Sequence, residues 1–211
     1  MFLTIASGSF GNLVEKRRKS IELCATLMFS AMRNNDNAGL FIFTDTVEKY
    51  IPARKGRRHV LKMISCLVSH KPTSKKTDLN NALSFVSSVI KKRSIIFVIS
   101  DFYSPDFEKP ISLLKNRHDV IAVRVNDFRE NTIPDIGLIN LEDEETGEQI
   151  LVDTSDSEFR KNYAKIISKE RKRLEKSLKK HKIDTISIFT DEPYDVPLRK
   201  FFKNRQKKVW S

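Results

Sequence analysis

Two kinds of apolar pattern alternate along this chain, and together they predict an α/β fold. Apolar side chains recur three and four positions apart, as on one helix face, over the segments 14–33, 57–70, 78–92, 107–116, 156–180 and 194–202. Short, mainly apolar runs lie at 2–5, 39–43, 95–99 and 118–125, and the segment 183–188 is expected to form a last strand. Runs of this kind are typical of strands buried on both faces of a parallel sheet that helices cover.

The run 95–99 is the best-defined of these strands, and it ends abruptly in Ser100 and Asp101. A polar pair at the carboxyl end of a central strand lies where α/β folds bind their ligands. Asp101 also suits a second interpretation, in which it caps the next helix or turn. The pattern of this strand alone leaves both interpretations open.

Two further segments complete the expected fold. Residues 47–52 alternate as an edge strand does, and an edge position tolerates Pro52. Residues 134–141 and 149–153 flank an acidic, glycine-containing turn and are expected to form a β-hairpin. We therefore predict one α/β domain over 1–211, doubly wound around a mostly parallel sheet, with a β-hairpin insertion near 134–153.

Length and composition exclude several classes of protein. The 211 residues are 39% hydrophobic and include 14 Phe, which is enough for a sizeable core. No apolar run reaches the roughly 18–20 residues of a membrane helix, and the first ten residues do not resemble a signal peptide. Cys24 and Cys66 lie apart in apolar helical patterns, which indicates core thiols in a cytoplasmic protein rather than a disulfide or a zinc site.

The formal net charge of +12 suggests an acidic partner, either nucleic acid or an acidic protein surface. The basic clusters are dispersed through the chain, at 16–19, 54–59, 91–93, 179–182 and 203–208. None is flanked by the stacking aromatic residues of a single-strand or RNA site. Solvated helix faces are therefore the favoured interpretation of these clusters.

Four oxygen-bearing side chains fall at the ends of predicted elements. Ser7 and Ser9 follow the first strand, Thr77 precedes a helix, and Asp101 follows the strand 95–99. The carboxyl ends of parallel strands meet at one edge of a sheet, so these side chains are expected to converge. Hydroxyl and carboxylate oxygens suit Mg²⁺ or Mn²⁺ rather than zinc.

A series of short motifs, in a fixed order, carries a family resemblance over essentially the whole chain. The motifs are ASGS at 6–9, NNDNAGL at 34–40, PARKGRRH at 52–59, KTDL at 76–79, ISDF at 99–102, RHDVIA at 117–122, PDIGL at 134–138, ETG at 145–147, VDT at 152–154 and TDE at 190–192. With them the chain resembles a von Willebrand factor A-like domain, and more narrowly the bacterial DUF58 family. Members of that family usually carry a region ahead of the first strand, so this chain is expected to be either a shortened protein or a truncated product.

The resemblance implies a metal-ion-dependent adhesion site of the form Asp-x-Ser-x-Ser, followed by a Thr and an Asp. Ser7, Ser9, Thr77 and Asp101 match its later members. The leading Asp is absent, because serine spacing places Ile5 at that position and the strand pattern places Ala6 there. We therefore expect any Mg²⁺ or Mn²⁺ to be held weakly.

The resemblance also implies a function, that of a non-enzymatic adaptor working with a MoxR-type AAA+ ATPase. The adhesion site would capture an acidic side chain of a partner, and the basic loop 54–59 would meet an acidic surface nearby. A basic nucleic-acid-binding protein is the alternative. A Mg²⁺-dependent phosphotransferase using Asp45, Asp78 and Asp101 is disfavoured, because the chain has no P-loop, G-x-S-x-G or G-x-G-x-x-G pattern. Asp78 is better explained as a helix N-terminal charge and Asp45 as a turn residue.

Overall fold

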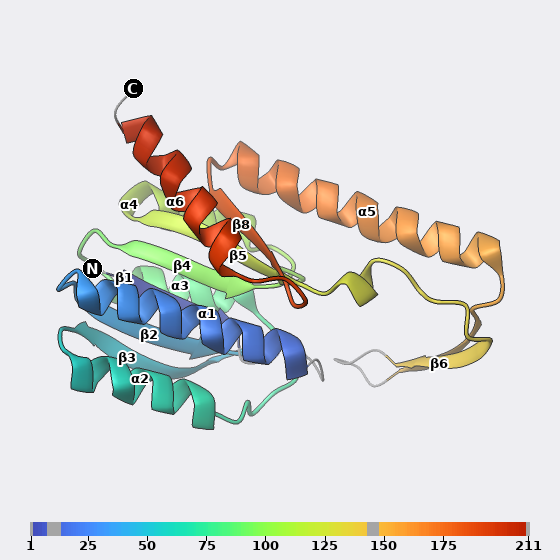
Figure 1. Ribbon diagram of the computed structural model, residues 1–211, viewed down its shortest axis with the longest axis horizontal. Helices are drawn as coiled ribbons and strands as arrows, with labels where there is room; N and C mark the ends of the chain where they lie inside the picture. Colours follow the sequence, from blue (N-terminus) through green and yellow to red (C-terminus); the bar gives the residue numbers. More distant parts are fainter. Residues whose placement is uncertain (1, 8–13, 143–147, 210–211) are drawn as a thin grey trace.

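A six-stranded sheet with helices on both faces forms the body of the protein (Figure 1). The computed structural model describes residues 2–7, 14–142 and 148–209. The strand order is β3-β2-β1-β4-β5-β8. The strands are β1 (Phe2–Ser7), β2 (Ala38–Phe43), β3 (Val47–Arg54), β4 (Ile95–Ser100), β5 (Asp119–Asn126) and β8 (Asp184–Phe189).

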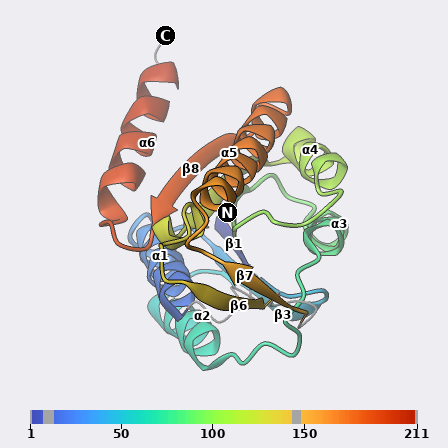
Figure 2. The same ribbon diagram turned by 90° about the vertical axis from the view of Figure 1, so that its right-hand side faces the viewer.

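The helices divide between the two faces of the sheet, as a doubly wound fold requires (Figure 2). One face is covered by α1 (Val14–Arg33), α2 (Arg57–Ser69) and α6 (Asp195–Val209). The other is covered by α3 (Leu79–Val89), α4 (Glu108–Arg117) and α5 (Ser157–Lys180). A short 3₁₀ helix, η1 (Phe128–Glu130), follows β5. The predicted doubly wound α/β architecture is thus confirmed.

Strand β4 is buried on both faces, as its unbroken apolar run predicts. Phe97 and Ile99 pack into the core on the α1 side, and Ile96 and Val98 into the core on the α3 side. Its parallel neighbours are β1 and β5. The predicted edge strand is also confirmed, because β3 pairs only with β2, antiparallel, at one margin of the sheet.

The predicted hairpin is present as a separate antiparallel pair, β6 (Leu138–Glu142) and β7 (Gln149–Asp153). Thr154 fastens its base, because its hydroxyl accepts a hydrogen bond from the N–H of Ile136 (3.0 Å) and donates one to the carbonyl of Gly137 (2.6 Å). The two views agree in placing the hairpin beyond the carboxyl ends of β1 and β4, clear of the main sheet (Figures 1 and 2).

One basic cluster is not the solvated surface that the sequence suggests. Lys16 and Lys19 on α1 are buried, at 2% and 9% exposure. The Lys16 ammonium pairs with the carboxylate of Glu130, and Lys19 Nζ donates a hydrogen bond to the carbonyl of Glu192 (3.0 Å). Each ammonium therefore has an oxygen partner contributed by a segment more than a hundred residues away.

The two cysteines and the last helix also differ in detail from expectation. Both thiols are free, but only Cys24 is buried, and Cys66 is half-buried. Helix α6 continues to Val209, beyond the predicted end at residue 202. In the described parts of the chain, no helix combines the length and apolar character needed to cross a bilayer.

Candidate functional site

The carboxyl edge of the sheet brings most of the predicted site together. Ser7 ends β1 and pairs with Phe43 at the end of β2, while Ala6 pairs with Ile99 of β4. The backbone of Ser7 therefore lies beside the end of β4, where Ser100 leads into Asp101. Ser9 lies outside the described residues, so its predicted place in the site stays a prediction.

Thr77 is held at the same edge by the residue that follows it. The backbone N–H of Asp78 donates to the carbonyl of Thr44 after β2 (2.9 Å), and the Asp78 carboxylate caps α3 by accepting from the N–H of Asn81 (2.9 Å). The N–H of Leu79 donates to the hydroxyl of Ser104 after β4 (3.1 Å). The start of α3 is thereby joined to the ends of two strands, and Asp78 has the helix N-terminal role predicted for it.

Asp101 organises a tight turn after β4. Its Oδ1 accepts hydrogen bonds from the N–H of Tyr103 and from the hydroxyl of Ser100, both at 3.3 Å. Phe102 between them adopts φ 64°, a left-handed conformation that is uncommon for a bulky residue. The turn interpretation of Asp101 is therefore confirmed, whereas the next helix begins only after Phe107. The carboxylate remains half-exposed at the edge.

The hydroxyl and carboxylate oxygens of the candidate site are of the kind that a hard divalent cation prefers, but together they supply little negative charge. Ala6, one of the two positions expected for the leading acid, is 2% exposed and packed in the core, where its methyl group offers no oxygen. In the chain as described, no three His, Cys, Asp or Glu side chains form a group that could hold a metal. Asp101 and Thr77 are thus the best-placed described donors, with one carboxylate between them, which implies weak binding.

Glu48, whose side chain is 5% exposed, supports the segment leading to Thr77. Glu48 Oε1 accepts from the hydroxyl of Thr44 and from the N–H of Thr73, both at 2.8 Å. Its Oε2 accepts from Nε2 of His70 at 2.5 Å. Burial raises the pKa of Glu48, but these hydrogen bonds outweigh it and the pKa falls below its ordinary value. Nothing in the alternating strand pattern distinguishes this acid from a solvent-facing one.

A cavity of about 420 Å³ lies beside Asp101, between the loop 102–108, β5 and α5. Arg124 of β5 lines it and is only 3% exposed. Its Nε has no hydrogen-bond partner among the described residues. The available signal in the sequence was an arginine inside the apolar run 120–125, which the sequence analysis took only as a buried strand.

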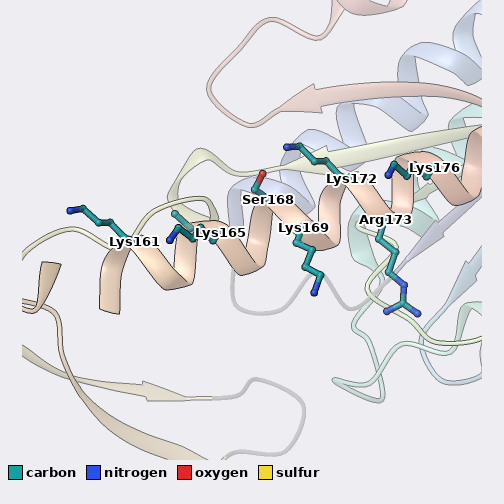
Figure 3. A pocket seen from close by; sticks show the side chains of 8 residues that line it. Lys161, Lys165, Ser168, Lys169, Lys172, Arg173 and Lys176 are labelled. Carbon is teal, nitrogen blue, oxygen red and sulfur yellow. The ribbon is translucent and has the colours of Figure 1, made fainter. Parts of the chain in front are cut away.

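A row of cations runs along α5 and continues from this cavity. Figure 3 shows the row, which comprises Lys161, Lys165, Lys169, Lys172, Arg173 and Lys176. Arg173 lines both this surface and the cavity. The helix has one buried residue, Leu178, so most of its length remains open to solvent.

The basic loop 54–59 does not lie near the candidate site, contrary to expectation. Arg54 pairs with Ala38 at the start of β2, and Val47 pairs with Phe43 at its end. Because β3 runs antiparallel to β2, the loop emerges at the amino edge of the sheet, opposite Asp101. The row on α5 instead shares Arg173 with the cavity lined by the loop that follows Asp101.

Comparisons with known proteins show which family has a similar sequence. A family described as "Protein of unknown function DUF58" matches residues 3–173. An uncharacterised protein of Mycobacterium tuberculosis is 25% identical over 206 residues, which cover 96% of this chain but only 65% of that protein. An uncharacterised protein of Mycobacterium avium is 27% identical over 160 residues, covering 74% of this chain and 94% of that one.

Two solved structures show the same fold at low sequence identity. A conserved hypothetical protein, BatB from Bacteroides thetaiotaomicron, superposes with a TM-score of 0.62 at 15% identity, covering 100% of this chain and 98% of that one. An aerotolerance-related membrane protein from Bacteroides fragilis, with multiple mutations to serines, gives 0.60 at 14%, covering 96% and 98%. The fold is therefore von Willebrand factor A-like.

Proposed function

This chain belongs to the DUF58 family, and we propose that it is a non-enzymatic protein-interaction module that binds a partner at the carboxyl edge of its sheet. The main support for this proposal is the hairpin β6–β7, which lies beyond that edge (Figure 1). Leu138, Ile150 and Leu151 on it are 68%, 64% and 66% exposed. Large apolar side chains gathered on one exposed element are typical of a protein-binding surface.

The finer part of the proposal concerns the adhesion site. Ser7, Ser9, Thr77 and Asp101 would hold Mg²⁺ or Mn²⁺ weakly, and the metal would take an acidic side chain from the partner. The half-exposed carboxylate of Asp101 and the placement of Thr77 at the same edge support this assignment. Weak binding is expected because only one carboxylate among these residues offsets the metal charge.

The partner we propose is a MoxR-type AAA+ ATPase with an acidic surface. The cationic row on α5 supports this, because it offers such a surface a long complementary face next to the carboxyl edge. The free thiols of Cys24 and Cys66 are consistent with a cytoplasmic setting, which the proposal retains.

A pull-down of the cognate ATPase on immobilised full-length chain tests the proposal. Replacing Leu138 and Leu151 by Ser should reduce capture, and so should Thr77→Ala and Asp101→Ala. Leu113→Ser on α4 is the matched control, since Leu113 is also exposed (62%) and away from the hairpin, and it should bind as the unaltered chain does. Undiminished capture by the hairpin variant would refute the proposed surface.

Nucleic-acid binding through the same row of cations is a second candidate. Six cations on one side of a helix suit a phosphate backbone. The residues lining that surface include no aromatic side chain for base stacking, which favours the acidic protein. Retardation of DNA or RNA that declines steeply with salt would support this candidate, and none at low salt would remove it.

A further inference from the structure

Arg124 is a buried cation without a counter-ion in the described structure. Its neighbours on β5, Val123 and Val125, pack into the core on the α1 side, so the arginine projects from the opposite face with Ala122. In the parallel register it lies beside Ser100, one residue before the turn of Asp101. Its side chain therefore enters the layer between the sheet and α5 at the carboxyl edge.

The contrast with Arg129, five residues further on, shows what Arg124 lacks. Arg129 is largely exposed, yet its guanidinium binds both carboxylate oxygens of Asp127, at 3.0 and 2.7 Å. Arg124 is 3% exposed and forms no ion pair with any described residue. Burial accordingly lowers the pKa of Arg124, while the charges of Glu175 and Asp101 act in the opposite direction. A buried guanidinium without a hydrogen-bonded anion is unfavourable, so this position gains from an anion supplied from outside.

The cavity beside Arg124 has the size and lining to admit that anion. Its volume of about 420 Å³ suits a small molecule or a single side chain. Hydroxyl groups of Tyr103, Ser104 and Ser177 line it, with Phe107 and Leu174 as apolar walls. This combination of apolar walls with a few polar groups is typical of a pocket that orients a ligand.

The charges around the cavity select the kind of anion. Three carboxylates, Asp106, Glu108 and Glu170, line it together with Arg171 and Arg173. The rim therefore carries a net charge of about −1, which opposes a phosphate dianion more strongly than a carboxylate monoanion, and one planar guanidinium matches one carboxylate in charge and shape. We propose that this cavity is a carboxylate-binding pocket, with Arg124 as the residue that holds the carboxylate group.

The pocket is distinct from the adhesion site in residues and in chemistry. It needs no metal, and neither Thr77 nor Asp101 is among the described residues that line it. The inference therefore does not rest on the proposed function. The carboxylate has two sources to be told apart, a free small molecule and an acidic side chain of a protein.

The Nε–Hε resonance of Arg124 in the full-length chain reports binding directly, because that N–H has no described protein partner. We expect titration with sodium acetate to shift it in a saturable manner, while sodium chloride at equal ionic strength leaves it in place. Sodium phosphate should shift it less than acetate. An unmoved Arg124 resonance in acetate, or the same movement in chloride, would overturn the proposal without any variant.

Two variants test whether Arg124 holds the carboxylate. Binding is followed by the chemical shift of the Ser104 backbone amide. Arg124→Met should abolish the saturable shift of that amide, and Arg18→Gln, on α1 across the sheet and outside the cavity lining, should retain it. Retained saturable binding in folded R124M would overturn the assignment. A capped Gly-Glu-Gly peptide that binds about tenfold or more tightly than acetate would identify a protein side chain as the source. Equal affinity would identify a free carboxylate.

Discussion

Glu48 on β3 accepts a hydrogen bond from Nε2 of His70, 2.5 Å from its Oε2 atom, and this contact joins the edge strand to the segment that carries Thr77. The same carboxylate binds the N–H and the hydroxyl of Thr73. The backbone carbonyl of His70 in turn accepts a hydrogen bond from Arg17 of α1. One acid, whose side chain is 5% exposed, therefore anchors the segment that leads to Thr77.

Replacing Glu48 by Gln should lower the free energy of unfolding by about 1–3 kcal/mol, because the donors of Thr44, His70 and Thr73 lose a charged acceptor. Urea denaturation measures this loss, and hydrogen exchange at the Thr73 amide should accelerate. Glu22→Gln is the control, since Glu22 pairs with Arg18 on the surface at 3.6 Å and should cost under about 1 kcal/mol. Equal losses in the two variants would contradict the assigned role of Glu48.

The buried pair of Lys16 and Glu130 should show a larger effect. Glu130→Gln removes the counter-ion of an ammonium whose side chain is 3% exposed, and we expect a loss of about 3 kcal/mol. The double variant Lys16→Met, Glu130→Gln should recover part of that loss, because no unpaired charge remains buried. Urea denaturation of the two single variants and the double variant measures the coupling, and simple additivity would contradict it.

His118 should make stability depend on pH. It is 3% exposed, and neither ring nitrogen makes a hydrogen bond of good geometry to a described residue, although the backbone of Ile90 favours the protonated ring. Burial and the neighbouring charge of Arg117 lower its pKa. The unfolded chain therefore takes up the proton first, near its ordinary pKa of about 6.5, so stability is fully present above that pH and declines below it.

The decline ends once the pH falls below the folded-state pKa of His118, and its slope should not exceed about 1.4 kcal/mol per pH unit. Urea denaturation across this range, compared with His118→Gln, isolates the contribution. The variant should show a flatter profile. An unchanged slope in the variant would mean that His118 is not responsible.

Metal binding should depend on Asp101 and not on its neighbour in the same loop. Mn²⁺ should broaden the amide resonances of residues 77–79 and 100–104 at high metal concentration, and Asp101→Asn should largely remove this broadening. Asp106→Asn is the matched control, because Asp106 is exposed and makes no hydrogen bond to the turn of Asp101. Broadening that persists in D101N but disappears in D106N would reverse the assignment.

The apolar patterns predicted the elements of this fold well, because each depends on residues close together in the sequence. The two-sided burial of β4 follows from its unbroken apolar run, and the edge position of β3 follows from its alternating pattern. The direction of β3 does not, and for that reason the basic loop 54–59 was expected at the wrong edge.

The interactions that the sequence did not predict join residues far apart. Lys16 meets Glu130 across 114 positions, and Glu48 meets His70 across 22. The periodicity of apolar residues along the sequence does not predict such pairings. The role of Arg124 could not be predicted either, because a lone arginine in an apolar strand indicates a binding site only once the cavity beside α5 is known.

Hydrogen exchange of the full-length chain, with and without the cognate MoxR-type ATPase, tests the central claim most directly. Capture at the carboxyl edge predicts slower exchange in residues 77–79, 100–104 and both strands of the hairpin, with residues 54–59 at the amino edge unchanged. Protection of residues 54–59, with none at the carboxyl edge or the hairpin, would contradict the claim.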